Sequence, residues 1–212
     1  LKQIGLNVNL LEPLENFPDS IFVEDTALIY KSSCIILNPF DKSRNKESKI
    51  ITNEIKKYFT NILYIENGYV EGGDVLNIND HFIIGISNRT DKKGAENLSK
   101  LLYSLGATVS ICKTPKDVLH FKSECSFLDD NLILVSEKMR GIEYLKSNYH
   151  LIEVPHGEEI AANSLRVNNN VLMPSGFKKT KDLLNKYFNI IEIKVDEISK
   201  VDAGLSCMSL RW

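Results

Sequence analysis

The chain has 212 residues with 43% hydrophobic content, enough to bury a full core, and we expect a single domain over residues 1–212. Its 26 basic and 28 acidic side chains give a net charge of −2 without a basic block, which argues against nucleic acid as a partner. No apolar run approaches the length of a membrane span, which argues against a membrane protein. The four cysteines are too sparse for a disulfide scaffold, so we expect reduced thiols in a cytoplasmic protein.

One pattern recurs along the chain. Each copy has two short apolar runs around a polar turn, which predict paired strands, followed by apolar residues at helical spacing. The paired runs are 27–30 with 34–37, 75–78 with 82–84, 127–128 with 132–135, and 165–167 with 171–173. The helical faces lie within 51–59, 95–105, 142–145 and 183–188. Repeats of this length predict stacked or radially arranged units that share a core.

The C-terminal residues Ser209–Trp212 are typical of a strand that opens a fifth copy. A closed ring would complete this copy from the N-terminal side of the chain. Residue 1 enters in mid-element, so we expect that a first segment is missing. The sequence therefore predicts an α/β fold, a five-bladed β/α propeller of strand–strand–helix–strand units with an incomplete N-terminus.

A polar residue precedes the opening strand of each copy. These residues are Asp25, Asp74, Cys125 with Ser126, Asn163 and Cys207. Radial units would turn all these strand starts towards one centre. On an ordinary β-sandwich the same residues would be scattered turn formers, and that alternative stays open.

Carboxylates gather at equivalent places before the first and second copies. They are Asp19, Glu24 and Asp25 in the first copy, and Glu71 and Asp74 in the second. The pair Gly72-Gly73 permits close approach of a ligand, although a tight turn is the simpler interpretation of two glycines. Because the carboxylates recur at equivalent places, they could bind one planar cation together, each at a different edge.

His120 is the histidine best placed to face a central site, where it could carry a proton near neutral pH. Cys207 could serve as a nucleophile only where surrounding charge favours its thiolate, and a lone cysteine is most often a buried apolar residue. A metal site made of His120, Cys125 and Cys207 lacks the usual close ligand spacing, so we expect no metal.

Two arginines, Arg44 and Arg89, follow the second strand of the first and second copies. Their forked donors could converge on one carboxylate, and solvated surface charge is the alternative interpretation. Carboxylates that could bind a cation, together with arginines that could bind a carboxylate, predict a pocket for an amino acid with a basic side chain.

Six segments, in order along the chain, resemble those of the dimethylarginine dimethylaminohydrolases, a family of the guanidino-group-modifying superfamily with the five-bladed pentein propeller. The segments are PDSIFVEDTA (18–27), EGGDVL (71–76), GISNRTDKKGAE (85–96), LHFKSECS (119–126), AANSLRVN (161–168) and KVDAGLSCMSLRW (200–212). The resemblance implies a catalytic domain that hydrolyses amidine C–N bonds without a cofactor. Its implied reaction converts Nω-methylated L-arginine to L-citrulline and methylamine or dimethylamine.

The resemblance also implies a role for each candidate residue. Cys207 would attack the guanidinium carbon to give a covalent thiouronium intermediate, and His120 would protonate the departing amine with support from Glu71. The implied substrate-binding residues are Asp19, Glu24 and Asp25 for the guanidinium pocket, Arg44 and Arg89 for the substrate carboxylate, and the Val201 carbonyl for the substrate amine.

Lys122 stands where arginine deiminases and amidinotransferases of this superfamily carry an aspartate, two residues after the catalytic histidine. The resemblance therefore favours a methylated arginine over arginine itself. A deiminase-like hydrolase of another guanidino compound and a non-catalytic propeller binding protein stay open, as does a homodimer. The family also has a lid-bearing segment before the first motif, and no residue of this sequence matches it.

Overall fold

Four three-stranded sheets follow one another along the chain in the computed structural model, which describes residues 1–129 and 131–212. The first sheet comprises β1 (Ala27–Tyr30), β2 (Ser33–Ile36) and β3 (Asn61–Tyr64), with helix α1 (Asn45–Ile55) before β3. The second comprises β4 (Val75–Ile78), β5 (His81–Ile86) and β6 (Thr108–Lys113), with α2 (Lys92–Ser104) before β6. The third comprises β7 (Cys125–Asp129), β8 (Leu132–Val135) and β9 (His150–Glu153), with α3 (Glu143–Asn148) before β9. The fourth comprises β10 (Leu165–Val167), β11 (Asn170–Pro174) and β12 (Asn189–Ile193), with α4 (Lys178–Leu184) before β12.

Each sheet has the same topology. The first two strands pair antiparallel, and the third pairs parallel with the second after the helical crossover. The polar turn residues Lys31, Asn79 and Asn168 adopt positive φ angles of 52°, 56° and 52°, which a two-residue connection of twisted strands requires. The predicted strand–strand–helix–strand unit is therefore confirmed in all four copies.

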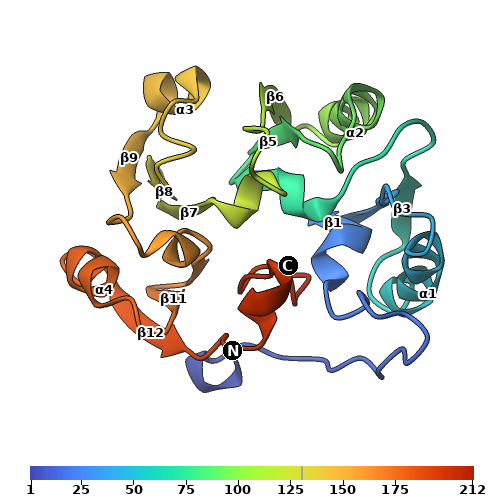
Figure 1. Cartoon of the computed structure of the whole chain (residues 1–212). Coiled ribbons are helices and arrows are strands. Elements are labelled where there is room, and N and C mark those ends of the chain that lie inside the picture. The colour runs from blue at the N-terminus through green and yellow to red at the C-terminus, as the bar shows by residue number, and fades with distance from the viewer. Residues whose placement is uncertain (130) are drawn as a thin grey trace.

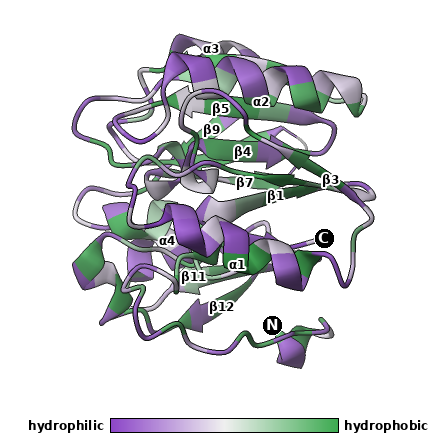
Figure 2. Cartoon of the chain, turned by 90° about the vertical axis from the view of Figure 1, so that its right-hand side faces the viewer, coloured by the Kyte–Doolittle hydropathy of each residue, from purple (hydrophilic) through white to green (hydrophobic). Residues whose placement is uncertain are grey.

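The four sheets are arranged as blades around a common centre, with helices α1 to α4 at the periphery (Figure 1). The strands carry mostly hydrophobic residues, whereas α1 and α2 alternate between hydrophilic and hydrophobic stretches (Figure 2). This pattern is the one expected when each helix packs one face against its sheet and exposes the other.

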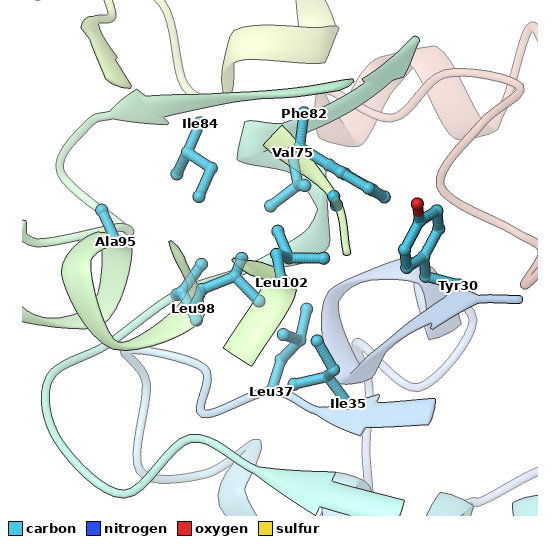
Figure 3. Close-up of a cluster of buried hydrophobic side chains, with 11 residues drawn as sticks. Tyr30, Ile35, Leu37, Val75, Phe82, Ile84, Ala95, Leu98 and Leu102 are labelled. Atoms are coloured by element: carbon cyan, nitrogen blue, oxygen red, sulfur yellow. The ribbon is translucent and has the colours of Figure 1, made fainter. Parts of the chain in front are cut away.

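The hydrophobic core lies mainly between adjacent blades. Tyr30 and Ile35 of the first blade pack with Val75, Phe82 and Leu98 of the second (Figure 3). The rings of Tyr30 and Phe82 meet edge to face with their centroids 5.1 Å apart. Further clusters join the second blade to the third and the third to the fourth. Each blade therefore depends on its neighbours for a buried face.

The fifth position of the ring differs from the prediction. Residues Ser209–Trp212 form no strand, because no strand of the described chain lies beside them to complete a hydrogen-bonded ladder. Instead Leu1 and Ile4 from the N-terminal end pack with Leu205 and Met208 against the fourth blade. Both chain ends thus occupy the space between the fourth and first blades (Figure 1).

None of the helices in the described part of the chain is both long and apolar enough to cross a membrane.

Candidate active site

Short 3₁₀ helices stand ahead of the innermost strands. Val23–Thr26 leads directly into β1 and Gly72–Asp74 into β4, while Phe121–Ser123 and Glu159–Ala162 precede β7 and β10. A further one, Ile198–Val201, precedes the segment that carries Cys207. These helices bring the backbone of every unit to the centre in a similar way. The residues at the strand starts therefore lie at equivalent places around the centre, where the polar residues recur.

Hydrogen bonds join these helices and strand starts into a closed ring. The donors and acceptors are Gly73 N to Asp25 Oδ1 (2.9 Å), Phe121 N to Asp74 Oδ1 (2.8 Å), Asn163 Nδ2 to the Lys122 carbonyl (2.7 Å), Ser206 N to Asn163 Oδ1 (3.2 Å) and Glu24 N to the Cys207 carbonyl (3.1 Å). The polar strand starts therefore face one centre, as the propeller interpretation predicts, and the sandwich alternative is wrong.

A buried acid–base pair occupies one side of the centre. His120 Nε2 lies 2.6 Å from Oε2 of Glu71, which is only 1% exposed. The other oxygen, Glu71 Oε1, accepts a hydrogen bond of 3.0 Å from the Phe40 N–H. Burial opposes protonation of His120, but the contact with Glu71 and the charge of Asp25 outweigh it and raise the pKa of His120 to about 9. His120 is therefore an imidazolium at neutral pH, ready to donate a proton.

The close packing of this pair depends on Gly73. A Cβ atom at that position would lie 2.7 Å from Cγ of His120. The neighbouring Gly72 is equally constrained, because its Cβ would lie 1.9 Å from the main-chain oxygen of Glu24. The glycine pair is thus required for packing around the centre, which goes beyond the tight turn considered from the sequence.

The ligating atoms of Asp25, Glu71 and His120 lie within 4.8 Å of one another. Such a cluster could hold a cation, and a planar guanidinium with several N–H donors suits two carboxylates as well as a metal ion does. The metal set of His120, Cys125 and Cys207 does not assemble, because Cys125 is buried and its Sγ bonds to the Phe121 carbonyl at 3.2 Å.

Cys207 is partly exposed, whereas the other three cysteines are buried. Its Sγ accepts a hydrogen bond of 3.4 Å from the Gly204 N–H. Burial raises the pKa of the Cys207 thiol, and the carboxylates of Glu24 and Asp25 raise it further against the opposing effects of Gly204 and Lys122. The thiol therefore stays protonated until a cation offsets the neighbouring acids.

Glu24 is buried and already bound to three groups. Its carboxylate accepts from Lys122 Nζ at 2.6 Å, from Arg211 Nη2 at 3.0 Å and from Ser206 Oγ at 2.9 Å. Burial alone would raise its pKa, but Lys122 and Arg211 lower it below the usual value. The carboxylate is thus an internal counter-ion, and the roles of Arg211 and Ser206 had no signal in the sequence beyond their place in the C-terminal motif.

Arg44 is buried and donates from all three of its nitrogens. Nη1 bonds to Asp25 at 2.8 Å, Nε and Nη2 bond to Glu47 at 3.0 and 2.9 Å, and Nη2 also reaches the main-chain oxygens of Asp19 and Phe22. Its visible role is to hold Asp25 in place.

Arg89 is freer, with a side chain 34% exposed and Nη1 4.0 Å from Glu71 Oε1. Hydrogen bonds from Ser43 lower the pKa of Asp41, and the charges of Arg89 and Arg44 lower it further. The two arginines therefore influence one carboxylate within the protein.

Two further candidates lie at the margin of the site. Asp19 is half-buried, and its main-chain oxygen accepts from the Phe22 N–H at 2.9 Å. Val201 is 60% exposed and ends the 3₁₀ helix that precedes Cys207. The next residue, Asp202, has a positive φ of 57°, which turns the chain back towards the centre.

A ring of β/α blades with a cysteine, a histidine–glutamate pair and inward carboxylates defines the guanidino-group-modifying class of proteins. The family model for arginine deiminase matches residues 2–161. The N(G),N(G)-dimethylarginine dimethylaminohydrolase of Pseudomonas aeruginosa is 36% identical over 216 residues, which span 100% of this chain and 84% of that protein. The chain belongs to the dimethylarginine dimethylaminohydrolase family.

Two solved structures agree with this assignment. A complex of the Pseudomonas aeruginosa enzyme, as a cysteine-to-serine variant, with citrulline superposes with a TM-score of 0.91 at 35% identity, covering 94% of this chain and 79% of that one. A dimethylarginine dimethylaminohydrolase with histidine replaced by glycine, as an adduct with S-methyl-L-thiocitrulline, gives a TM-score of 0.93 at 35% identity, covering 97% of this chain and 82% of that one.

Proposed function

We propose that this protein hydrolyses Nω-methylated L-arginine to L-citrulline and methylamine or dimethylamine. The observation that carries the proposal is the pairing of a protonated His120 on Glu71 with a partly exposed Cys207 beside buried carboxylates. The Pseudomonas aeruginosa relative, whose name states this activity, supports the proposal.

The substrate cation supplies the charge that Cys207 lacks in the free protein. A guanidinium held by Asp25 offsets the negative field that raises the thiol pKa, so the thiol releases its proton to solvent and the thiolate forms when substrate is bound. The thiolate then attacks the guanidinium carbon and forms a C–S bond. His120 gives its proton to the methylated nitrogen, and the C–N bond breaks with release of the amine.

Water completes the reaction. The now neutral His120 takes a proton from a water molecule that attacks the thiouronium carbon, the C–S bond breaks, and citrulline leaves. The imidazolium and the free cysteine are restored, so thiol, imidazole and water suffice and the chemistry needs no cofactor. Glu71 holds the imidazole in place and stabilises its charge throughout.

Substrate binding is assigned to groups around this centre. Arg89 is the better candidate for the substrate carboxylate because it is partly exposed, and Arg44 would contribute only through an N–H left over from its internal bonds. The Val201 carbonyl and Asp19 are assigned to the substrate amine and the pocket edge. Glu24 acts on the guanidinium through its charge, because its carboxylate is bound to Lys122 and Arg211.

The decisive experiment compares citrulline formation by the wild type and by Cys207→Ser. The variant is expected to stay folded and to lose activity, and unchanged turnover would refute the cysteine mechanism. Cys112→Ser is the matched control, because Cys112 is buried on the second sheet and has no role in the chemistry.

A deiminase-like hydrolase is the second candidate, and substrate preference separates the two. Lys122 occupies the position at which a deiminase would have an aspartate to bind the unsubstituted nitrogens of arginine. Here that position carries a cation, which is bound to Glu24. We therefore expect a higher kcat/KM for dimethylarginine than for arginine, and the reverse order would favour the deiminase. A non-catalytic propeller would show turnover of neither.

We further infer that residues 1–212 act as a single domain in the cytoplasm. The four cysteines are unpaired, which suits a reducing compartment. Light scattering on the purified protein distinguishes a monomer from a homodimer.

A further inference from the structure

A cavity of about 300 Å³ lies along the axis of the ring, lined by the innermost strands. Its apolar wall comes from every blade and from the C-terminal segment, through Leu28, Leu76, Phe127, Leu165 and Leu210. None of the described residues that line it is Cys207, His120 or Glu71. The cavity is therefore separate from the catalytic groups, and Glu24 stands at the boundary between them.

The polar lining of this cavity carries more positive than negative charge. Lys122, Arg166 and Arg211 line it, and Glu24 is the acid among its described lining residues. Lys122 has a side chain only 12% exposed, with Nζ on Glu24 at 2.6 Å. Arg166 lies 3.7 Å from Asp129 and also donates to the main-chain oxygen of Leu128. A cavity with this balance attracts an anion.

Ser126 adds an independent observation. It lies in β7, lines the cavity and is only 7% exposed, and its Oγ has no hydrogen-bond partner among the described residues. A buried hydroxyl without a partner costs free energy comparable to a lost hydrogen bond, so such groups generally face a ligand or an ordered water. Ser126 is therefore a spare hydrogen-bond donor in the wall of the cavity.

We propose that this axial cavity binds a small carboxylate with a short hydrocarbon body. The carboxylate accepts hydrogen bonds from Lys122 and Ser126, and the hydrocarbon packs on Leu28, Leu76 and Phe127. The volume lies at the small end of ligand sites, which limits the ligand to a few carbon atoms. This binding site is independent of the proposed hydrolysis.

The test is a titration of the ¹⁵N-labelled protein with acetate, butyrate and hexanoate, followed by NMR. The side-chain amide of Asn163 is the reporter, because Asn163 lines the cavity and its Nδ2 donates to the Lys122 carbonyl at 2.7 Å. We expect saturable shifts, with butyrate binding about tenfold more tightly than acetate because it buries two more methylene groups. Neutral butyramide is expected to leave the signals unmoved.

Two variants distinguish the cavity from the catalytic face. Ser126→Val fills the cavity and removes the hydroxyl while leaving the Lys122–Glu24 ion pair in place, and it should abolish saturable binding. Arg89→Met removes the cation assigned to the catalytic face and should leave butyrate binding unchanged. Leu165→Phe is a second cavity-filling variant, and thermal unfolding confirms that each variant is folded.

Three results would overturn the proposal: no saturable shift in the wild type, full binding in both cavity-filling variants, or loss of binding in Arg89→Met. Inorganic phosphate is the remaining probe. If it binds as tightly as butyrate, the apolar wall contributes nothing and the assigned ligand class is wrong.

Discussion

His120 Nε2 lies 2.6 Å from Glu71 Oε2, and the two residues come from the approaches to neighbouring blades. The contact combines a charged hydrogen bond with deep burial of the acid, so each group fixes the protonation state of the other. The protonation states of His120 and Glu71 are therefore fixed before the substrate binds.

Replacement of Glu71 by Gln should lower the pKa of His120 from about 9 by one unit or more, because a neutral amide cannot stabilise the imidazolium. The measurement is an NMR titration of the His120 ring carbons. Glu54→Gln, on a solvated ion pair of α1, is the matched control and should leave the titration unchanged. An unaltered His120 pKa in Glu71→Gln would show that the pair is not ionic.

Folding stability should fall as the pH rises from 6.5 to above 9. The folded pKa of His120, about 9, exceeds the unfolded value of 6.5, so its contribution is fully present below 6.5 and lost as the pH passes 9. The difference is on the order of 3 kcal/mol. Urea unfolding of the wild type and of His120→Asn measures it, since the variant lacks this contribution. Parallel pH curves for the two proteins would contradict the prediction.

Gly72→Ala should destabilise the protein by about 1–3 kcal/mol, because its Cβ would meet the Glu24 backbone at 1.9 Å. Gly73→Ala meets the His120 ring instead, at 2.7 Å, and should reduce kcat more than stability. Thermal unfolding and steady-state kinetics separate the two effects. Gly141→Ala is the control, because nothing lies within 4 Å of its Cβ position.

Lys122→Met should cost about 1–3 kcal/mol of folding free energy, because it leaves the buried Glu24 with Arg211 as its remaining cation. A double-mutant cycle with Glu24→Gln, measured by urea unfolding, gives the coupling between the two charges. Lys146→Met removes an exposed ion pair with Glu143 and should change stability by less than about 0.5 kcal/mol. Additive effects of Lys122→Met and Glu24→Gln would mean that the pair is not coupled.

Iodoacetamide should label Cys207 before any other cysteine. Burial raises the pKa of Cys34 to about 12 and that of Cys112 to about 11, and it raises that of Cys125 as well. The pKa of Cys207 is also raised, but Cys207 is partly exposed whereas the other three are buried, so the reagent reaches it first. Peptide mass spectrometry over time gives the order of labelling. Cys207→Ser should remain unlabelled over the same period, and early modification of Cys125 would show that the blade interface opens.

Much of the fold could be predicted from local sequence pattern. The alternation of apolar runs and polar turns identified the two hairpin strands of each three-stranded blade, since a tight hairpin depends on residues next to one another, as the positive φ of Lys31 and Asn79 shows. The fifth position could not be predicted in this way. Whether Ser209–Trp212 forms a strand depends on a partner strand beside it, and pairing is a property of the assembled ring.

The candidate site shows the same division. The sequence by itself determined which residues are candidates for the chemistry, because Cys207, His120 and Glu71 stand at recurring places before strands and within motifs. Only the tertiary structure decided which charges meet. Arg44 is bound to Asp25, and Glu24 is bound to Lys122 and Arg211 from distant parts of the chain. Ion pairing at the centre of a ring depends on how the blades close, and no spacing along one chain encodes that distance.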